Sequence, residues 1–512
     1  MCVLAPSGQK DLAGHLGIHA VGGWQGPARN WRARDHGAKT ALAGITVLVT
    51  GAIAVRAWLI LGYGPAFVGF GDSHEYVDAA LRGVFSDVQK PAGYPIFLQG
   101  LHQFSDSLTC TILVQHALGL ATGLLLYSSV RRAGAPPWLG LLPAAIVFFG
   151  GTGLLLEHSL LADSLFAFLK ATGVYAAVRA LCEPGLRWPL LSGLAIGVSF
   201  WVKTVGLSSA VLVPLLLLAA APGIARRRLL SATVAAGAAI VVIAGYVAVQ
   251  GASTGYWGYE RQGAWNLYGR VATFVDCSRF TPPTGTRFLC PTESPAHRQS
   301  QSFYQYARSA PAVVRFGGPA HAPGYANAML QSFSVAAIEH EPIAYAGAIV
   351  HGLSLYVSPR SGEGYTPESM REALLNSKGV KSIEPAVTRF YHHSRGYQGD
   401  ASDINSLTRY ESYTRVQGSV LVVLLLAAAI GAPLLPGRVR SAAILFTLTA
   451  FLSITLAVAG NGYDARYAYP AFGPLAAGAA LGAWGVAIGL RRQIRRRRQR
   501  ADAMRKPSAE RL

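Results

Sequence analysis

The residues best suited to chemistry lie in one polar stretch between two apolar segments, Gly71 to Ala80 (GDSHEYVDAA). If this stretch is helical, Asp72, Glu75 and Tyr76 share one face, because residues three and four apart in a helix are neighbours. Carboxylates on one face can take the proton of an acceptor hydroxyl or bind a metal such as magnesium or manganese. The alternative is that Asp72 only caps a solvated surface helix.

Two more acids, Glu157 and Asp163, lie in the segment EHSLLADSLF at the start of an apolar run. An acid in or near hydrocarbon is costly and by default marks a functional site. Both residues are therefore candidates for the catalytic group. Alternatively, Glu157 is an exposed turn residue and Asp163 caps the start of a helix.

Two cations lie next to apolar runs, Lys203 in WVKTVG and Arg466 in NGYDARYAYP. Cations at such positions could neutralise a phosphate, arginine by two-pronged contact and lysine as a point charge. The alternative is that they extend toward water at a membrane surface. Four ring-bearing residues beside the motifs are candidates for substrate contact: His74, Tyr76, Tyr94 and Tyr467.

The composition predicts that membrane-spanning helices position these motifs. Hydrophobic residues make up 51% of the chain and charged residues only 14%, so a soluble core could not bury the apolar surface. The 45 basic residues exceed the 25 acidic ones and give a formal charge of +20. These charges lie mostly between apolar runs, which is typical of basic cytoplasmic loops. We therefore expect the lipid bilayer, and no nucleic acid, as a partner.

Ten apolar segments approach the about 20 residues that a helix needs to cross a bilayer. They lie near residues 40 to 61, 108 to 130, 136 to 154, 160 to 181, 188 to 203, 206 to 222, 229 to 250, 417 to 435, 441 to 460 and 469 to 490. Every second loop is basic, which predicts a multi-pass protein of the plasma membrane with both termini in the cytoplasm. The apolar segment 343 to 357 is too short to cross and is predicted to lie on the outer surface.

The same segments predict the order of domains. It comprises a cytoplasmic tail (1 to 38), a transmembrane core (39 to 250) whose first external loop is 62 to 107, an external cap (251 to 416), C-terminal transmembrane helices (417 to 490) and a basic cytoplasmic tail (491 to 512). The cap is rich in Tyr, Ser, Arg, Gly and Pro and lacks a long apolar run. Cys277 and Cys290 both lie in the cap, where an oxidising exterior would let them form a disulfide.

The order of the motifs resembles that of a known family. An acidic motif in the first outer loop is followed by the turn KPAGYP, an acid at the fourth span, a cation after the fifth and an Arg-Tyr motif before the last. With this order the chain looks like the GT-C superfamily of membrane glycosyltransferases, especially the bacterial relatives of protein O-mannosyltransferases and the aminoarabinose transferases that modify lipid A. The resemblance covers residues 40 to 250 and, less closely, Tyr463 to Pro474.

The resemblance implies an all-α polytopic fold with a GT-C-like core, in which Asp72 is the catalytic base. Glu75 takes the second acidic position, although Ser73 and His74 separate it from Asp72 where protein mannosyltransferases have adjacent acids. Such an enzyme moves a sugar from a polyprenyl-phosphate donor to a glycan, lipid or protein acceptor at the outer face of the membrane. Because the lipid phosphate is a good leaving group, the enzyme needs a carboxylate, cations and correct positioning. Lys203 and Arg466 are the expected ligands of the donor phosphate.

Two other functions fit the same residues. A transporter or lipid flippase would use the intramembrane acids as proton relays. A polysaccharide ligase or polymerase would use a pyrophosphate-linked donor with other spans. The gathering of unusual polar residues on one side of the predicted membrane, beside a large cap, favours the glycosyltransferase. Mannose, arabinose and glucose are all open as the sugar.

Overall fold

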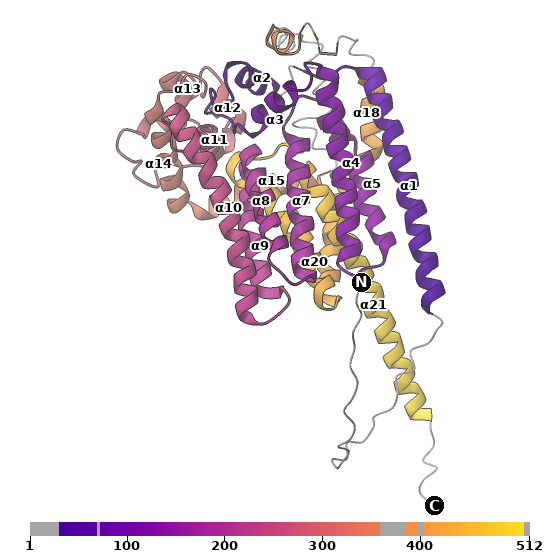
Figure 1. Ribbon diagram of the computed structural model, residues 1–512. Coiled ribbons are helices and arrows are strands. Elements are labelled where there is room, and N and C mark those ends of the chain that lie inside the picture. The colour runs from indigo at the N-terminus through magenta and orange to yellow at the C-terminus, as the bar shows by residue number, and fades with distance from the viewer. Residues whose placement is uncertain are drawn as a thin grey trace, which may run out of the picture.

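The computed structural model is helical throughout the part of the chain that it describes, residues 30–68, 72–358, 385–392, 394, 396–397 and 404–505. Most of the predicted N-terminal tail, residues 1–29, and the last seven residues of the basic tail lie outside these ranges. Within them there is no strand, and one isolated parallel bridge joins Phe67 to Ser159. Long helices form an upright bundle, and shorter helices cover one end and one side of it (Figure 1).

Seven helical segments of the described chain are long and apolar enough to cross a membrane. They are α1 (Asn30–Tyr63), α4 (Leu108–Arg132), α7 (Asp163–Cys182), α10 (Ala225–Thr254), α18 (Ile404–Thr414) continued by α19 (Ser419–Gly431), α20 (Gly437–Asn461) and α21 (Tyr469–Arg505). Each coincides with one of the ten predicted segments. The chain is thus an all-helical protein with the helices of a membrane protein.

The three other predicted segments form bent or short helices. Segment 136 to 154 becomes η1 (Pro137–Gly140) with α5 (Leu141–Phe149), followed by α6 (Gly151–Glu157) at an angle of 54°. Segment 188 to 203 becomes α8 (Arg187–Val202), and segment 206 to 222 becomes α9 (Leu207–Ala220) after the turn η2 (Thr204–Gly206). The number of crossings therefore stays a prediction, because length and composition identify seven helices that could cross, or eight if the bent pair is one span.

The bend between α5 and α6 is made by glycines. Gly150 has an extended backbone with φ −62° and ψ 117°, which ends α5. A Cβ on Gly151 would lie 2.6 Å from the Cα of Glu411, and a Cβ on Gly153 would lie 2.5 Å from the ring of Tyr469. Small residues are therefore needed here, since α18 and the start of α21 pack directly on the bent segment.

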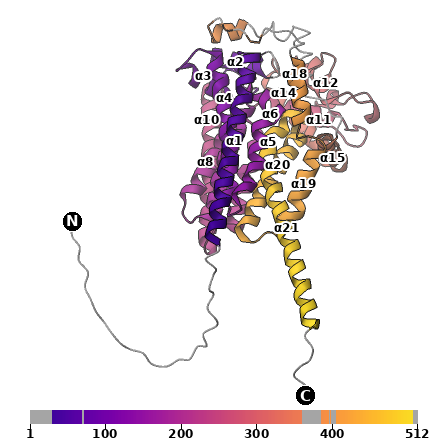
Figure 2. The same ribbon diagram turned by 90° about the vertical axis from the view of Figure 1, so that its right-hand side faces the viewer.

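One end of the bundle, lowest in Figure 1, is strongly basic, and we call it the basic end. There Glu183, which follows α7, accepts from Arg179 of α7 at 2.5 Å. It also lies 3.7 Å from Arg187 at the start of α8 and 4.0 Å from Arg132 at the end of α4. These ion pairs link the ends of the three helices. At the same end α21 extends beyond the other helices with the exposed arginines of Arg491–Arg498 (Figures 1 and 2). Basic helix ends are thus gathered on one side of the fold, as the sequence predicts.

The opposite end carries the segments that hold the chemical motifs, and we call it the cap end. Two short helices, α2 (Ser73–Arg82) and α3 (Gly93–His102), lie over it. Beside them α11 (Gln262–Ala272), α12 (Gln301–Tyr306), α13 (Pro311–Phe316) and α14 (Gly324–His340) form a helical cap with its own apolar cluster around Trp265, Tyr268 and Phe333. A disulfide joins Cys277 to Cys290 in this cap, with Cα atoms 6.1 Å apart.

Two other described helices of the predicted external region 251 to 416, α18 and α15 (Pro342–Val357), pack on the bundle. Helix α18 packs on α6 within the bundle, because it continues into the apolar helix α19. Helix α15 lies against α20, where a Cβ on Gly352 would meet Val458 at 2.6 Å. Its outer face exposes Ile343 and Val350, as expected of a helix that contacts lipid. That it stops short of crossing stays a prediction.

Candidate functional site

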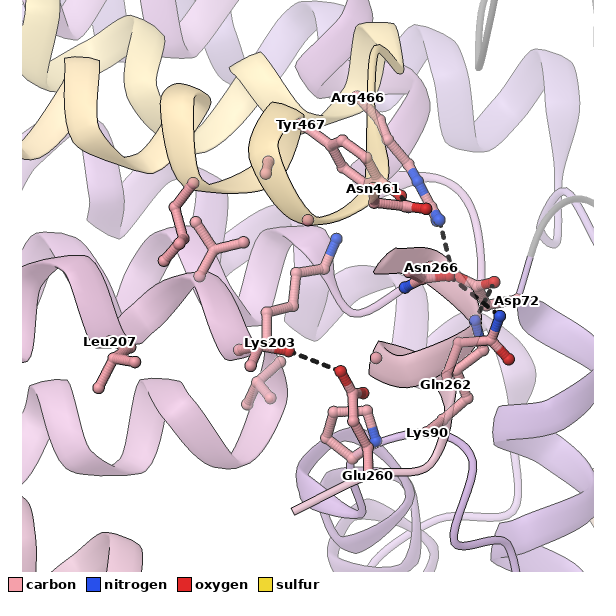
Figure 3. A pocket seen from close by; sticks show the side chains of 18 of the residues that line it. Asp72, Lys90, Lys203, Leu207, Glu260, Gln262, Asn266, Asn461, Arg466 and Tyr467 are labelled. Carbon is pink, nitrogen blue, oxygen red and sulfur yellow. Dashed lines mark hydrogen bonds and ion pairs between the residues drawn. The ribbon is translucent and has the colours of Figure 1, made fainter. Parts of the chain in front are cut away.

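A cavity of about 290 Å³ lies where the cap end of the bundle meets the helical cap. It combines residues from the first polar loop, the α8–α9 turn, the cap and the start of α21 (Figure 3). Five of the predicted site residues line it: Asp72, Tyr76, Lys203, Arg466 and Tyr467. The fold thus brings together groups that are as much as 395 positions apart in the sequence, from Asp72 to Tyr467.

Asp72 lies at the N-terminus of α2 but does not cap it with its side chain. Its Oδ1 accepts from Lys90 Nζ at 2.9 Å, and its Oδ2 lies 2.8 Å from Nη2 of Arg466. The carboxylate therefore joins two cations at the wall of the cavity, and the interpretation as a simple helix cap is wrong. Burial raises the pKa of Asp72, but the charges of Arg466 and Lys90 outweigh it and hold the pKa well below its usual range.

Lys203 lies in the extended turn between α8 and α9, and its Nζ donates to Oδ1 of Asp163 at 2.5 Å. Its side chain is only 15% exposed, so it does not extend toward water. Asp163 is the first residue of α7 and makes this ion pair without capping the helix. The pKa of Lys203 is lowered overall. Burial and the charge of the nearby Arg466 lower it, and together they outweigh the charge of Asp163, which raises it. An anion bound between the two cations would relieve this repulsion.

The turn KPAGYP places Lys90 at the wall of the cavity that Lys203 also lines. A Cβ on Gly93 would lie 2.5 Å from the backbone oxygen of Trp201, so only glycine lets α3 approach the end of α8 this closely. The backbone N–H of Ala92 also donates to the hydroxyl of Tyr246 on α10 at 3.0 Å. The position of Lys90 is therefore fixed by packing between three elements.

Arg466 lies in a short turn, η6 (Ala465–Ala468), directly before α21. Asp464 accepts from the backbone N–H of Arg466 at 3.0 Å, and its Oδ2 lies 3.3 Å from Nε of the same residue. The hydroxyl of Tyr356 on α15 donates to the backbone oxygen of Asp464 at 2.7 Å. The ring of Tyr467 contacts both cations, with its centroid 5.4 Å from the Arg466 guanidinium and 5.9 Å from Lys203 Nζ.

The cap supplies a polar wall to the cavity, formed by Glu260, Gln262, Asn266 and Tyr306. Thr204 donates to the carboxylate of Glu260 at 2.7 Å. Burial raises the pKa of Glu260 to about 6, in spite of this hydrogen bond and the charge of Lys90. Gln262 donates through its amide to Asn266 Oδ1 at 3.1 Å and to the Tyr306 hydroxyl at 2.9 Å.

Opposite this wall the cavity is apolar. Val202, Val205, Leu207, Leu456 and Ala457 line it there, from the ends of α8, α9 and α20. Leu207 and Leu456 are also 43% and 39% exposed, so the apolar wall continues onto the outer face of the bundle. A ligand with one charged group and one apolar chain therefore fits this arrangement.

The other candidates for substrate contact lie away from the cavity. His74 is exposed on the outer side of α2. Tyr94 is fully buried behind Tyr76, with the two ring centroids 4.9 Å apart, and its hydroxyl donates to Gln115 at 2.5 Å. Glu75 does not line the cavity; burial raises the pKa of its carboxyl. Tyr76 and Tyr467 are therefore the two candidates for substrate contact that line the cavity.

Glu157 belongs to a second, sealed cluster within the bundle. Both of its carboxylate oxygens accept from Arg56 at 2.9 Å, and His116 Nδ1 lies 2.9 Å from Oε2. His116 in turn contacts His158, whose Nε2 lies 2.9 Å from the backbone oxygen of Tyr63. Glu157 is 0% exposed and does not line the cavity. It is therefore neither an exposed turn residue nor part of the candidate site.

Sequence reasoning missed Lys90 and the polar wall of the cap. Lys90 stands in the turn KPAGYP, where only the proline and glycine attracted notice, and its pairing with Asp72 depends on the chain reversal there. The wall residues lie in a region without a recognisable motif. The concentration of carboxamides and tyrosines around Gln262 is the one signal that could have indicated it.

The predicted metal ligands Asp72 and Glu75 do not converge on a common point in the cavity. Among the described residues there is no group of three or more His, Cys, Asp or Glu side chains arranged to hold a metal ion. Both oxygens of Asp72 already contact cationic side chains, with which a metal would compete. A metal requirement stays a prediction.

Comparison with known proteins adds no relative from which a function could be transferred. No model of a protein family matches the chain, and no curated protein matches it. The resemblance in motif order therefore stays an interpretation of the sequence. The side chains that line the cavity therefore carry the functional proposal.

Proposed function

We propose that the protein is a membrane glycosyltransferase that takes a sugar from a polyprenyl-phosphate donor and passes it to an acceptor at the outer face of the membrane. The observation that carries this proposal is the composition of one cavity, in which Asp72 lies beside Lys90, Lys203 and Arg466 and opposite an apolar wall. A lipid-linked phosphate needs cations for its charge and an apolar surface for its chain. The reaction also needs a carboxylate for the acceptor proton.

The donor phosphate would bind between Lys203 and Arg466, both of which lie within 6 Å of the centroid of the Tyr467 ring. The prenyl chain would leave along Leu207 and Leu456 toward the lipid. Arginine offers two parallel donors to a phosphate, and lysine supplies a further point charge. The same cations would stabilise the negative charge that develops on the leaving lipid phosphate.

Asp72 would act as the general base once the donor has bound. In the absence of donor it is a weak base, because Arg466 and Lys90 hold its pKa well below the usual range. A phosphate that takes up the charge of Arg466 would release part of this effect and raise the pKa of Asp72. The oxygen of the acceptor then attacks the anomeric carbon, its proton moves to Asp72, and the bond between that carbon and the phosphate oxygen breaks with inversion. Polyprenyl phosphate leaves with the bonding electrons.

The orientation of the protein in the membrane is part of the proposal. Arginines gather at the basic end, around Glu183 and along the exposed end of α21, and positive residues favour the cytoplasmic side. The cavity lies at the other end, under the helical cap. This arrangement supports an active site on the extracytoplasmic side of the plasma membrane.

The test is transfer by the purified protein in nanodiscs, without an ion gradient. Radiolabelled mannosyl-, glucosyl- and arabinosyl-phosphoryl polyprenols are supplied as donors, and a cell-envelope fraction provides acceptors. The proposal predicts that label moves to the acceptor fraction and that polyprenyl phosphate is released. If label moves only across a vesicle membrane in response to a gradient, the transporter interpretation replaces the proposal. A requirement for a pyrophosphate-linked donor would point to the ligase or polymerase.

A further inference from the structure

We propose that the cap face of the cavity is a binding wall for the sugar of the donor, and that it recognises the sugar through its hydroxyl groups. The wall consists of Glu260, Gln262, Asn266 and Tyr306. This inference rests on the proposed function, because the proposed function places the phosphate of the donor and this inference places its sugar. It concerns residues of the cap, which the resemblance to known glycosyltransferases does not cover.

The chemistry of the wall differs from that of the rest of the cavity. The phosphate side is cationic and the lipid side is apolar, whereas the wall offers two carboxamides, one phenol and one carboxyl. A carboxamide donates and accepts at once, and a sugar hydroxyl does the same, so the two match in hydrogen bonding. Few other ligand groups would use a row of such side chains beside a phosphate site.

The carboxamides are held in place by a hydrogen-bonded network that leaves some of their groups for a ligand. Asn266 Oδ1 accepts from Gln262 at 3.1 Å and from Gln305 at 3.3 Å, which fixes the orientation of its amide. Behind it, Gln305 also donates to Asn461 at 3.1 Å, and this links the cap to the end of α20. Within the described chain no protein group accepts from Asn266 Nδ2. Figure 3 shows the Asn266 side chain between those of Lys203 and Asp72.

The wall is attached to the loop that carries the catalytic groups. The backbone N–H of Arg261 donates to Val88 O at 2.8 Å, and that of Gln262 donates to Gln89 O at 3.3 Å. The start of α11 is therefore bonded directly to the residues that precede Lys90. This fixes the distance from the wall to Asp72, as is needed for a sugar held between the phosphate and the base.

The charges around the cavity are largely paired within the protein. Lys90, Lys203 and Arg466 line it with Asp72 and Glu260, and Asp163 and Asp464 pair with Lys203 and Arg466 behind the lining. The wall therefore recognises the sugar by hydrogen bonding to its hydroxyl groups and not by a net charge.

The test separates the contribution of the sugar from that of the phosphate. Binding to the full-length protein is measured with mannosyl-, glucosyl- and arabinosyl-phosphoryl citronellol and with methyl citronellyl phosphate, which carries the same charge without a sugar. We expect the wild type to bind at least one glycosyl diester more tightly than the methyl diester. Asn266→Ala and Gln262→Leu should each reduce this preference by about threefold to tenfold and leave binding of the methyl diester unchanged.

The matched control is Gln331→Ala, which removes an exposed carboxamide of the cap helix α14 that does not line the cavity, and it should keep the full preference. Gly263→Leu gives a second, independent variant. A Cβ on Gly263 would meet no atom closer than 3.8 Å, and Gly263 lines the cavity, so a side chain added there has room to begin and extends the wall into the cavity. It should exclude the glycosyl diesters selectively.

Each other outcome has a distinct meaning. If the wild type binds glycosyl and methyl diesters equally, or if the wall variants keep the full preference, the sugar wall is wrong while the phosphate site stands. If the wild type binds none of the diesters, the proposed function itself fails, and the inference fails with it.

Discussion

The molecule contains two clusters of acids and cations that look alike in the sequence and differ in the fold. In one cluster, Asp72 joins Lys90 and Arg466 at the wall of a cavity, and its side chain is 16% exposed. In the other, Glu157 joins Arg56 and His116 within the bundle, and it is 0% exposed. Both acids are candidates for catalysis in the sequence. The comparison teaches that an ion pair alone does not mark a candidate site, because Asp72 lines a cavity and Glu157 does not.

The sealed cluster also has a consequence for the open one. The backbone N–H of Phe67 donates to His158 O at 3.0 Å, and Phe67 O accepts from Leu160 at 3.3 Å. The segment that leads to Asp72 is therefore bonded to the residues directly after Glu157. The sealed cluster thus lies beside the junction that leads to Asp72 at the wall of the cavity.

The largest expected effect is that of Asp72→Asn on the rate of transfer. The change keeps the shape of the side chain and removes the proton acceptor, so the single-turnover rate should fall by about two to four orders of magnitude. Donor binding should be retained or tightened, because the phosphate no longer competes with Asp72 for Arg466. The thermal unfolding midpoint should also fall, because Lys90 and Arg466 lose a counter-charge, so the rate is measured per folded molecule. Near-normal turnover would remove Asp72 as the base and make Asp163 the next candidate.

Glu157→Gln should show the opposite pattern. The change leaves the buried Arg56 without its counter-charge, and breaking a buried pair in this way costs about 3 to 5 kcal/mol of stability. Thermal unfolding in detergent should therefore begin at a clearly lower temperature, while the transfer rate per folded molecule stays within about threefold of the wild type. The double variant Arg56→Met with Glu157→Leu should recover part of the stability, since no charge is then left unpaired. A rate loss as large as that of Asp72→Asn, in molecules shown to be folded, would contradict the distinction between the clusters.

Lys203→Ala and Arg466→Ala should each weaken donor binding and slow transfer, by about tenfold to a hundredfold. Each change removes a partner of the phosphate charge in both the ground state and the transition state. Donor affinity and single-turnover rate are measured for each variant, with Arg466→Lys as a conservative control that keeps the charge but loses the two-pronged contact. If Lys203→Ala and Arg466→Ala bind the donor as tightly as the wild type, the phosphate lies elsewhere.

The smallest expected effect is a pH dependence of donor binding that depends on Glu260. Its carboxyl is neutral below a pKa of about 6 and ionised above it, so a negative charge enters the cavity as pH rises. Donor affinity should therefore fall by roughly threefold to tenfold between about pH 5 and pH 7, since the phosphate diester itself does not titrate there. Glu260→Gln should abolish this change. A pH profile that Glu260→Gln leaves intact would assign the titration to another group.

The same carboxyl should affect stability with a definite sign. Its pKa in the folded protein, about 6, is above the ordinary value of 4.5, so the folded state binds the proton more tightly than the unfolded chain. The contribution of Glu260 is fully present below pH 4.5 and is lost as pH rises through about 6. The free energy of unfolding should fall over this interval in the wild type relative to Glu260→Gln.

Much of the fold and part of the site could be predicted from the sequence. Apolar run length indicated all seven long helices, because a bilayer imposes one length on every span. Asp72, Lys203 and Arg466 could be selected by type, because charged residues beside apolar runs are rare. The bend at Gly150 could not be predicted, since it depends on the close approach of Glu411 and Tyr469 to neighbouring glycines.

The parts that were missed depend on tertiary pairing. Nothing local distinguishes Glu157 from Asp163, and only the approach of α1 with Arg56 seals the first of them inside the bundle. In the same way, Asn266 is an ordinary polar residue until the hydrogen bonds of α11 to Val88 and Gln89 bring the cap to the cavity. Both features depend on contacts between segments far apart in the chain, and the pattern of a single sequence does not show which distant segments meet.

The most direct test of the central claim is the position of a lipid phosphate in an experimental structure of the protein in nanodiscs with a polyprenyl-phosphate donor. The account predicts phosphate density within about 3 Å of Lys203 Nζ and the Arg466 guanidinium. It also predicts that the prenyl chain runs along Leu207 and Leu456. Phosphate density in a different groove, such as that beside Trp58 and Arg409, with the cavity around Asp72 unchanged, would contradict it.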